Sequence, residues 1–312
     1  MRALIVSVGA LLAAAMLLHF ANGMSYTLTN VRLSGDGVSA TLQGLVGSFY
    51  FAGYLLGPFV AVRTIRAVGH IRSFCLFAAL VSIGVLNMAL VGDVYAWAVS
   101  RFAMGLSLVS LLTVTESWLN DRTDSANRGQ LLSVYFIIVY AAQAGGTLTA
   151  GAMSPWTFYP FVFAAMLFAL CLAPVALTRI ENPTPPQSEG FGFRRLFRIS
   201  PLAVVGAVAC GVLQSAAYTI APVYVLAAGF ESGSAVAGFQ AAAIIGSVVL
   251  SWPIGKLSDR IDRRTVLIGV AVACGVASLA LAFAAAGRSI AALYILAALY
   301  GGLATGLYSL AA

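Results

Sequence analysis

Gly255-Lys256-Leu257-Ser258-Asp259-Arg260-Ile261-Asp262-Arg263-Arg264 is the stretch that decides the fold class of this chain. Six of its ten residues are charged, whereas 9% of all 312 residues are charged and 61% are hydrophobic. A helix-length apolar run lies on each side of the stretch. A charge cluster between two such runs is typical of a short loop at a membrane surface. We therefore expect an all-α polytopic membrane protein.

Apolar runs long enough to cross a bilayer fill most of the chain. The mean hydropathy of +0.97 excludes a soluble globular protein, and a transmembrane helix needs about 20 apolar residues. The runs are continuous rather than alternating, which excludes a β-barrel. The first run lacks an A-x-A cleavage site, so we expect a retained span rather than a signal peptide. Ten runs qualify, at residues 3–28, 39–62, 71–91, 94–118, 129–152, 156–178, 201–228, 234–254, 265–286 and 289–312.

The basic residues are distributed unevenly between the two sides of the membrane. If the N-terminus is cytoplasmic and the sides alternate, fourteen basic residues fall on the cytoplasmic side and only Arg32 and Arg288 on the other. This bias predicts a cytoplasmic N-terminus in a bacterial inner membrane. The net charge of +7 thus indicates orientation rather than nucleic-acid binding. The fourteen are Arg2, Arg63, Arg66, Arg72, Arg122, Arg128, Arg179, Arg194, Arg195, Arg198, Lys256, Arg260, Arg263 and Arg264.

A polar, proline-containing stretch at 179–200 interrupts the runs. It predicts a cytoplasmic linker between an N-terminal half at 1–178, with six spans, and a partial C-terminal half at 201–312, with four. The loops at 62–72 and 255–264 occupy matching places in the two halves, with Arg66 and Asp259 193 residues apart. Internal repeats of this kind are common in secondary transporters. Because the chain stops inside an apolar run, we expect a fragment that lacks two C-terminal helices of twelve; a natural ten-span protein is the alternative.

The loop at 255–264 resembles the signature loop of the major facilitator superfamily, Gly-x-x-x-Asp-Arg-x-Gly-Arg-Arg. Asp262 stands where that pattern has its second glycine. The resemblance implies the major-facilitator fold. It also implies that the loop aspartate caps a neighbouring helix end and pairs with arginine as a conformational latch. The alternative is that these charges only anchor the topology. The matching residues are Gly255, Asp259, Arg260, Arg263 and Arg264.

A second pattern, Glu116-Ser117-Trp118-Leu119-Asn120 followed by Asn127-Arg128-Gly129, resembles the YcaD-like branch of the superfamily. The resemblance covers essentially the whole chain and implies no particular substrate. We expect Glu116 either to pair with Arg72 or Arg128 as part of the latch, or to be a simple surface carboxylate.

Arg101 is the strongest single functional candidate. The segment Arg101-Phe102-Ala103-Met104-Gly105 resembles the superfamily's Arg-x-x-x-Gly element. An arginine inside a span costs several kcal/mol unless it faces a cavity or a partner. Snorkelling of the side chain to the outer surface is the alternative.

Polar residues at helical spacing mark two further spans. His19, Asn22 and Tyr26 are spaced i, i+3, i+7, and Gln214 and Tyr218 are spaced i, i+4. In the superfamily the first helix of each three-helix unit lines the central cavity. The resemblance therefore implies that these residues line a substrate and coupling cavity with Arg101, and that His19 is a candidate proton relay. Interhelical hydrogen bonding is the alternative.

Together these observations predict a secondary active transporter that moves a small solute across the inner membrane by alternating access, with protons as the expected coupling ion. The chain has no nucleotide-binding glycine loop, no His-Glu-x-x-His and no Gly-x-Ser-x-Gly, so we predict no enzymatic activity and no cofactor. The four cysteines lack metal-ligand spacing, so we predict no metal site.

The alternatives to a transporter are a transporter-like receptor or scaffold and a membrane-embedded enzyme. The expected partners are a small-molecule substrate, protons and the lipid bilayer, and the expected state is a monomer.

Overall fold

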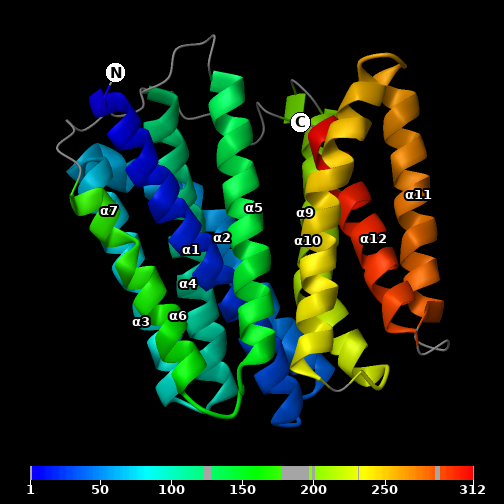
Figure 1. Ribbon diagram of the computed structural model, residues 1–312, viewed down its shortest axis with the longest axis horizontal. Coiled ribbons are helices and arrows are strands. Elements are labelled where there is room, and N and C mark those ends of the chain that lie inside the picture. Colours follow the sequence, from blue (N-terminus) through cyan, green and yellow to red (C-terminus); the bar gives the residue numbers. More distant parts are fainter. Residues whose placement is uncertain are drawn as a thin grey trace. The chain divides into compact units, whose positions relative to one another are not determined.

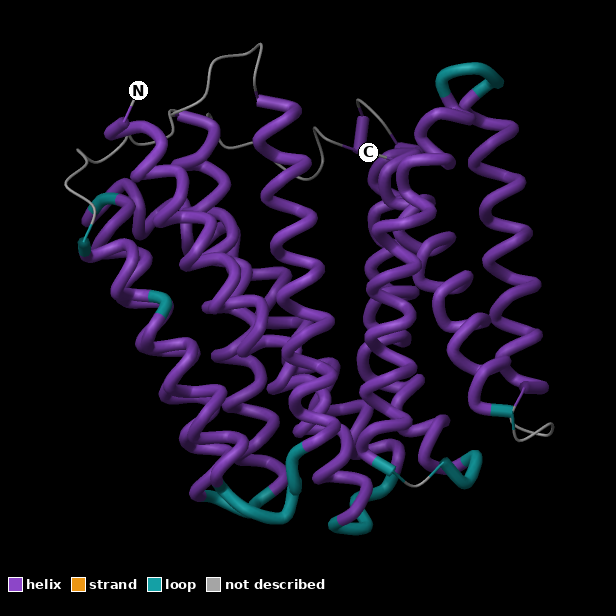
Figure 2. Tube along the Cα trace, in the orientation of Figure 1, coloured by secondary structure: helices purple, strands orange, loops and turns teal. Residues whose placement is uncertain are grey.

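The computed structural model describes residues 2–121, 128–177, 197–198, 201–230, 232–284 and 289–311. Within these ranges all regular secondary structure is helical (Figures 1 and 2), as the apolar runs predict. The helices are α1 (Arg2–Gly35), α2 (Ala40–Val68), α3 (His70–Leu90), α4 (Val94–Asp121), α5 (Arg128–Ala152), α6 (Tyr159–Leu170), α7 (Leu172–Ala176), α9 (Pro201–Ala227), α10 (Gly233–Ser258), α11 (Arg263–Ala284) and α12 (Ile290–Ala311).

The part of the chain that the structure describes contains ten helical segments long and apolar enough to cross a membrane, with α6 and α7 together forming one of them. They correspond one to one with the predicted runs. Large apolar side chains are exposed along these helices; Leu55, Leu90 and Phe283 are 71%, 81% and 75% exposed. Such side chains would be unfavourable in water but are suited to lipid.

Several helices continue beyond the predicted runs. Helix α1 ends at Gly35 rather than at residue 28, and α2 ends at Val68 rather than at residue 62. Falling hydropathy marks the membrane boundary, whereas a helix can continue past it because its backbone hydrogen bonds are internal. The predicted run at 156–178 is divided into α6 and α7, and Pro174 in the first turn of α7 has no N–H to continue the α6 ladder.

The chain divides into two compact units, Met1–Gln187 and Ser188–Ala312. We call them the N-unit, which contains α1 to α7, and the C-unit, which contains α9 to α12. The boundary lies inside the predicted linker at 179–200. Apart from residues 197 and 198, that linker lies outside the described residues.

Close packing of α2 on α4 organises the N-unit. A Cβ atom on Gly53 would collide with the carbonyl oxygen of Phe102, and one on Gly105 would collide with the carbonyl oxygen of Tyr50. The two helix backbones therefore touch, and only glycine fits at these positions. Helix α1 packs in turn mainly on α5.

The C-unit repeats this close contact between α10 and α12. A Cβ atom on Gly246 would collide with the carbonyl oxygen of Ala298, and one on Gly301 with that of Ala243. Gly53 and Gly246 are 193 residues apart, the same separation as the two matching loops. The α10/α12 pair is therefore the counterpart of the α2/α4 pair.

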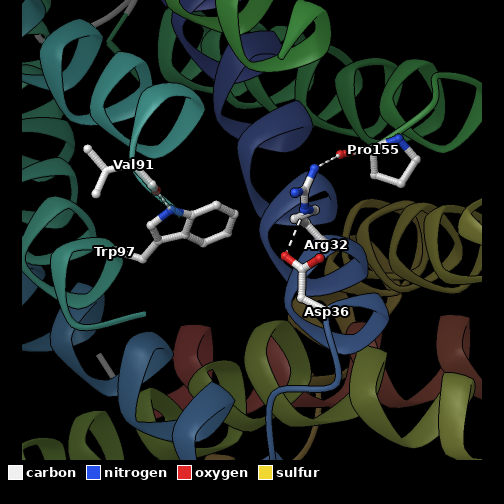
Figure 3. Close-up of polar contacts among 5 residues, drawn as sticks. All are labelled: Arg32, Asp36, Val91, Trp97 and Pro155. Carbon is white, nitrogen blue, oxygen red and sulfur yellow. Dashed lines mark hydrogen bonds and ion pairs between the residues drawn. The ribbon is translucent and has the colours of Figure 1, made fainter. Parts of the chain in front are cut away.

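Polar contacts fix the loops at one end of the N-unit (Figure 3). Arg32, near the end of α1, donates from Nε to Asp36 Oδ2 at 2.8 Å and from Nη1 to the Pro155 carbonyl oxygen at 3.1 Å. Between α3 and α4, Trp97 Nε1 donates to the Val91 carbonyl oxygen at 2.6 Å. Arg32 thus joins the end of α1 to the segment that follows α5.

Candidate functional site

The polar face of α1 is turned into the N-unit. His19, Asn22 and Tyr26 are buried, each no more than 5% exposed. Helix α1 contacts α5, α6, α7, α4 and α2, so these side chains lie against other helices of the same unit. The predicted spacing thus does place the three residues on one buried face.

Arg101 is buried in α4 and is only 2% exposed. Its guanidinium carbon lies 4.6 Å from the ring centroid of Tyr26 and 4.2 Å from that of Tyr50. The side chain is therefore in contact with α1 and α2, and does not snorkel to the outer surface.

The two tyrosine rings lie on the same side of the guanidinium. Their centroids are 5.0 Å apart, in an edge-to-face arrangement. The guanidinium carbon and the two ring centroids therefore form a nearly equilateral triangle. Rings on opposite faces would be separated by the sum of the two distances from Arg101, so Tyr26 and Tyr50 do not enclose Arg101 between them.

The Arg-x-x-x-Gly spacing explains how Tyr50 reaches Arg101. Gly105 lies one turn after Arg101 in α4, and its missing side chain lets the backbone of Tyr50 touch α4. The Tyr50 hydroxyl then donates to Asn22 Oδ1 at 3.4 Å. Residues from α1, α2 and α4 are thereby brought together, and we call Asn22, Tyr26, Tyr50 and Arg101 the arginine cluster.

Two of the three guanidinium nitrogens of Arg101 are not satisfied within the arginine cluster. Its Nε and Nη1 atoms are buried and have no hydrogen-bond partner among the described residues. A desolvated cation–π contact contributes about 2 kcal/mol, but each buried donor left unpaired costs about 1–3 kcal/mol. The rings therefore compensate for part of the charge and leave the donors available to an acceptor.

His19 is a second buried group without a hydrogen-bond partner. Neither ring nitrogen reaches an acceptor or donor in the described part of the chain, although the side chain of Gln143 from α5 lies near the ring. A neutral imidazole can accept one proton at its free nitrogen. His19 therefore has the chemistry for proton transfer, and Gln143 is the polar side chain beside its ring.

Gln214 and Tyr218 lie on α9 in the C-unit, and both are half-buried. Gln214 Nε2 donates to Thr305 Oγ1 of α12 at 3.5 Å, and Thr305 Oγ1 donates to Ser247 Oγ of α10 at 2.9 Å. Gln214 thus takes part in an interhelical network of its own unit.

In the charged loop, Asp262 rather than Asp259 caps the following helix. Asp262 Oδ1 accepts from the Arg264 backbone N–H at 2.7 Å, at the start of α11. Asp259 is exposed at the end of α10, and its backbone N–H bonds to the Gly255 carbonyl oxygen at 3.2 Å. Asp262 immediately precedes α11, so its carboxylate lies beside the free N–H groups of that helix. The latch in which Asp259 caps a neighbouring helix end stays a prediction.

Arg263 connects the same loop to α12. Its Nε donates to the Leu310 carbonyl oxygen near the end of that helix at 2.8 Å, where a cation interacts favourably with the helix dipole. The side chains of Arg260 and Arg264 are exposed, and Gly255 is half-buried in the last turn of α10.

Glu116 faces tyrosines rather than a described basic residue. The half-buried carboxyl group lies close enough to Tyr54 and Tyr135 to interact with them electrostatically. Arg72 is exposed, and no ion pair joins it to Glu116 in this conformation. The side chain of Arg128 lies outside the described part of the structure. The gate that pairs Glu116 with an arginine stays a prediction.

Sequence reasoning missed Tyr50 and His70. Tyr50 carries no signal of its own in an apolar run, but the glycines at 53 and 105 would have indicated the close contact that places it. His70 Nε2 lies 3.1 Å from Ser117 Oγ and joins the start of α3 to the end of α4. Within the described residues no group of three or more His, Cys, Asp or Glu side chains is arranged to hold a metal ion.

Comparisons with known proteins agree with this architecture. The sequence profile of the Major Facilitator Superfamily matches residues 7–312. An uncharacterized MFS-type transporter of Enterobacter sp. (strain 638) is 29% identical over 261 residues, which cover 82% of this chain and 68% of the relative. The uncharacterized MFS-type transporter YcaD of Escherichia coli is 27% identical over 260 residues, with the same coverage.

Solved structures show the same fold. The nucleoside transporter NupG superposes with a TM-score of 0.77 at 13% identity, over 98% of this chain and 80% of its own. A bacterial homolog of the human lysosomal transporter Spinster, in an inward-facing and unoccupied conformation, gives 0.75 at 15% identity, over 97% and 74%. At these identities the likeness concerns the fold alone.

Proposed function

The chain belongs to the major facilitator superfamily, and from this premise we propose that it is a secondary active transporter that moves a small solute by alternating access. As a member of this family with ten membrane-capable helices in its described part, it is a multi-pass membrane transporter. The proposal adds the mechanism, proton coupling, a monomeric state, and a bacterial inner membrane with the N-terminus in the cytoplasm.

The observation that carries the proposal is Arg101. A buried guanidinium with two unpaired nitrogens destabilises the helix bundle, because no described residue compensates for them. Ionisable residues retained inside membrane spans at such a cost are usually functional. We assign Arg101 to the solute-binding site, with Asn22, Tyr26 and Tyr50 around it.

His19 supports the proton-coupling part of the proposal. It is buried on the same α1 face as Asn22 and Tyr26, and the side chain of Gln143 from α5 lies beside its ring. Histidine is the side chain whose ordinary titration lies nearest neutral pH. We propose that His19 takes up and releases the coupling proton, and that Gln214 and Tyr218 contribute to the same transport cycle from α9.

The charged loop supports the conformational part. We propose that Asp259, with the arginines at 260, 263 and 264, stabilises one state of the cycle, and that Glu116 is paired with Arg72 or Arg128 in another state. The exposed position of Asp259 leaves its carboxylate available for such a contact.

Proteoliposomes that contain the purified protein provide the test. A panel of labelled amino acids, nucleosides, sugars and monocarboxylates would be screened for saturable counterflow and for uptake accelerated by an inward proton gradient. We expect one solute class to show both activities. His19→Gln should keep counterflow and lose the acceleration, because counterflow requires no net proton movement.

Two results would contradict the proposal. A solute that binds the reconstituted protein without any counterflow would indicate a receptor rather than a transporter. Uptake that is insensitive to the proton gradient in the unmodified protein would remove the coupling.

A further inference from the structure

The internal repeat supplies a comparison for Arg101 within the same chain. The contact between Gly105 and the carbonyl oxygen of Tyr50 in the N-unit corresponds to that between Gly301 and the carbonyl oxygen of Ala243 in the C-unit. Arg101 lies four residues before Gly105, and Ala297 lies four residues before Gly301. Arg101 therefore corresponds to Ala297. The N-unit thus has the pair Tyr50 and Arg101 where the C-unit has two alanines.

This comparison shows that helix packing does not require the arginine. In the C-unit Ala297 is completely buried, and α10 and α12 still make the same backbone contact. Packing in membranes generally favours small residues at such contacts. Arg101 and Tyr50 are therefore additions to a contact that also forms with alanine at both positions, and their presence calls for a role other than packing.

The surroundings of Arg101 indicate what that role is. No carboxylate of the described residues lies within 4.0 Å of it, and Asn22 Oδ1 accepts from the Tyr50 hydroxyl. The only charge in the arginine cluster is thus positive, and its Nε and Nη1 donors have no acceptor in the described structure. A neutral solute would leave the charge uncompensated, and a cation would be repelled by it.

We propose that the transported solute carries a carboxylate and that Arg101 binds this group. The planar guanidinium offers several N–H donors suited to a carboxylate, and the rings of Tyr26 and Tyr50 lie on one side of it and do not enclose it. Because Arg101 is 2% exposed, the carboxylate enters in a state in which the helices of the N-unit separate. The inference rests on the proposed function only in naming the ligand as the transported solute.

Direct binding to the protein in lipid nanodiscs tests this inference without measuring transport. The probes are acetate, benzoate and octanoate, each compared with its neutral amide, acetamide, benzamide or octanamide. Affinity would be measured by calorimetry at constant ionic strength, and thermal stability would be recorded alongside. The variants are Arg101→Ala, Arg101→Lys and the control Arg32→Ala.

We expect at least one carboxylate to bind and its amide to bind more weakly by about tenfold or more, as for the loss of a charged hydrogen bond. Arg101→Ala should lose the same factor, and it should fold because alanine occupies the equivalent place in the C-unit. Arg101→Lys should retain part of the affinity. Arg32→Ala should bind as the unmodified protein does, because Arg32 is engaged with Asp36 and Pro155 instead.

Three outcomes would overturn the inference. They are an amide that binds as well as its carboxylate, a carboxylate that binds Arg101→Ala as tightly as the unmodified protein, and no binding by any of the three carboxylates. Carboxylate binding that depends on Arg101 but is accompanied by no counterflow would leave the inference standing and refute the proposed transport. Transport of a neutral solute would support the proposed transport and overturn the inference.

Discussion

At the scale of single residues, Arg32 and Arg101, the two arginines of the N-unit that are buried or half-buried among its described residues, differ in how fully they are paired. Arg32 is bonded to Asp36 and to the Pro155 carbonyl oxygen, and its guanidinium lies 5.5 Å from the ring of Trp156. Arg101 has two aromatic neighbours, but its Nε and Nη1 have no acceptor in the described part of the protein. The first arrangement stabilises the fold, and the second destabilises it in the absence of solute.

This difference predicts opposite effects of two similar substitutions. Arg101→Ala should raise the free energy of unfolding of the solute-free protein by about 2 kcal/mol, because the removal of two unpaired donors, at about 1–3 kcal/mol each, outweighs the loss of about 2 kcal/mol of cation–π stabilisation. Arg32→Ala should lower it by about 1 kcal/mol, because satisfied hydrogen bonds are lost. Thermal denaturation of both variants in the same lipid nanodiscs measures the difference. A lower stability for Arg101→Ala than for Arg32→Ala would show that Arg101 is a structural residue.

The two aspartates of the charged loop also differ. Asp262→Ala removes the N-cap of α11 and should lower stability by about 1 kcal/mol. Asp259→Asn should leave stability unchanged and reduce the rate of counterflow, because its carboxylate caps none of the described helices and is proposed to act in another state. Asp93→Ala serves as a capping control, since Asp93 Oδ2 accepts from the Ala96 N–H at 2.8 Å. Normal counterflow in Asp259→Asn would reduce that residue to a topology anchor.

The functional candidates among the charged residues could be predicted from the sequence, whereas those among the aromatic residues could not. A lone arginine in a span is conspicuous because of its cost, so Arg101 could be predicted. Tyr50 could not, because a tyrosine in an apolar run has many possible surroundings and only the α2/α4 contact selects one. The Asp262 cap could not be predicted either, because it depends on where α11 begins, and the latch role of Asp259 stays a prediction.

At the scale of helices, glycines determine which pairs approach closely. Gly105→Ala should destabilise the α2/α4 pair by about 1–3 kcal/mol, the usual cost of overpacking, because the new Cβ would collide with the backbone of Tyr50. Gly301→Ala should have a similar effect on α10/α12. Gly44→Ala is the matched control within α2, since a Cβ atom there meets no atom within 4 Å. Thermal denaturation in lipid nanodiscs measures these differences. Equal stability for Gly105→Ala and Gly44→Ala would contradict the packing argument.

Helix number could be predicted from hydropathy, and helix length could not. All ten predicted runs correspond to membrane-capable helices in the described residues. Hydropathy reports the thickness of the hydrocarbon, so it gave no sign that α1 reaches Gly35. It also could not show the break between α6 and α7, because the residues on both sides of Cys171 are equally apolar.

At the scale of the whole molecule, the uneven distribution of basic residues makes a testable statement about orientation. With the N-terminus in the cytoplasm, Gly92 in the loop after α3 should face the periplasm and Ile261 in the loop after α10 should face the cytoplasm. Both positions are exposed. On a Cys75→Ser background, a membrane-impermeant maleimide applied to intact cells should label Gly92→Cys, and Ile261→Cys only after the cells are permeabilised. The opposite labelling pattern would invert the topology.

The matched glycine contacts of α2/α4 and α10/α12 also carry a historical consequence. Two helix pairs with the same backbone collision points, 193 residues apart between α2 and α10 and 196 apart between α4 and α12, are the expected product of duplication of an ancestral gene segment. The two copies share the glycines but differ in the residues beside them, which are tyrosine and arginine in the N-unit and alanine at both positions in the C-unit. On the proposal above, only the N-unit copy carries a group that binds solute. The double variant Ala243→Tyr with Ala297→Arg would test whether the α10/α12 pair still folds with a tyrosine and an arginine at the positions that match Tyr50 and Arg101.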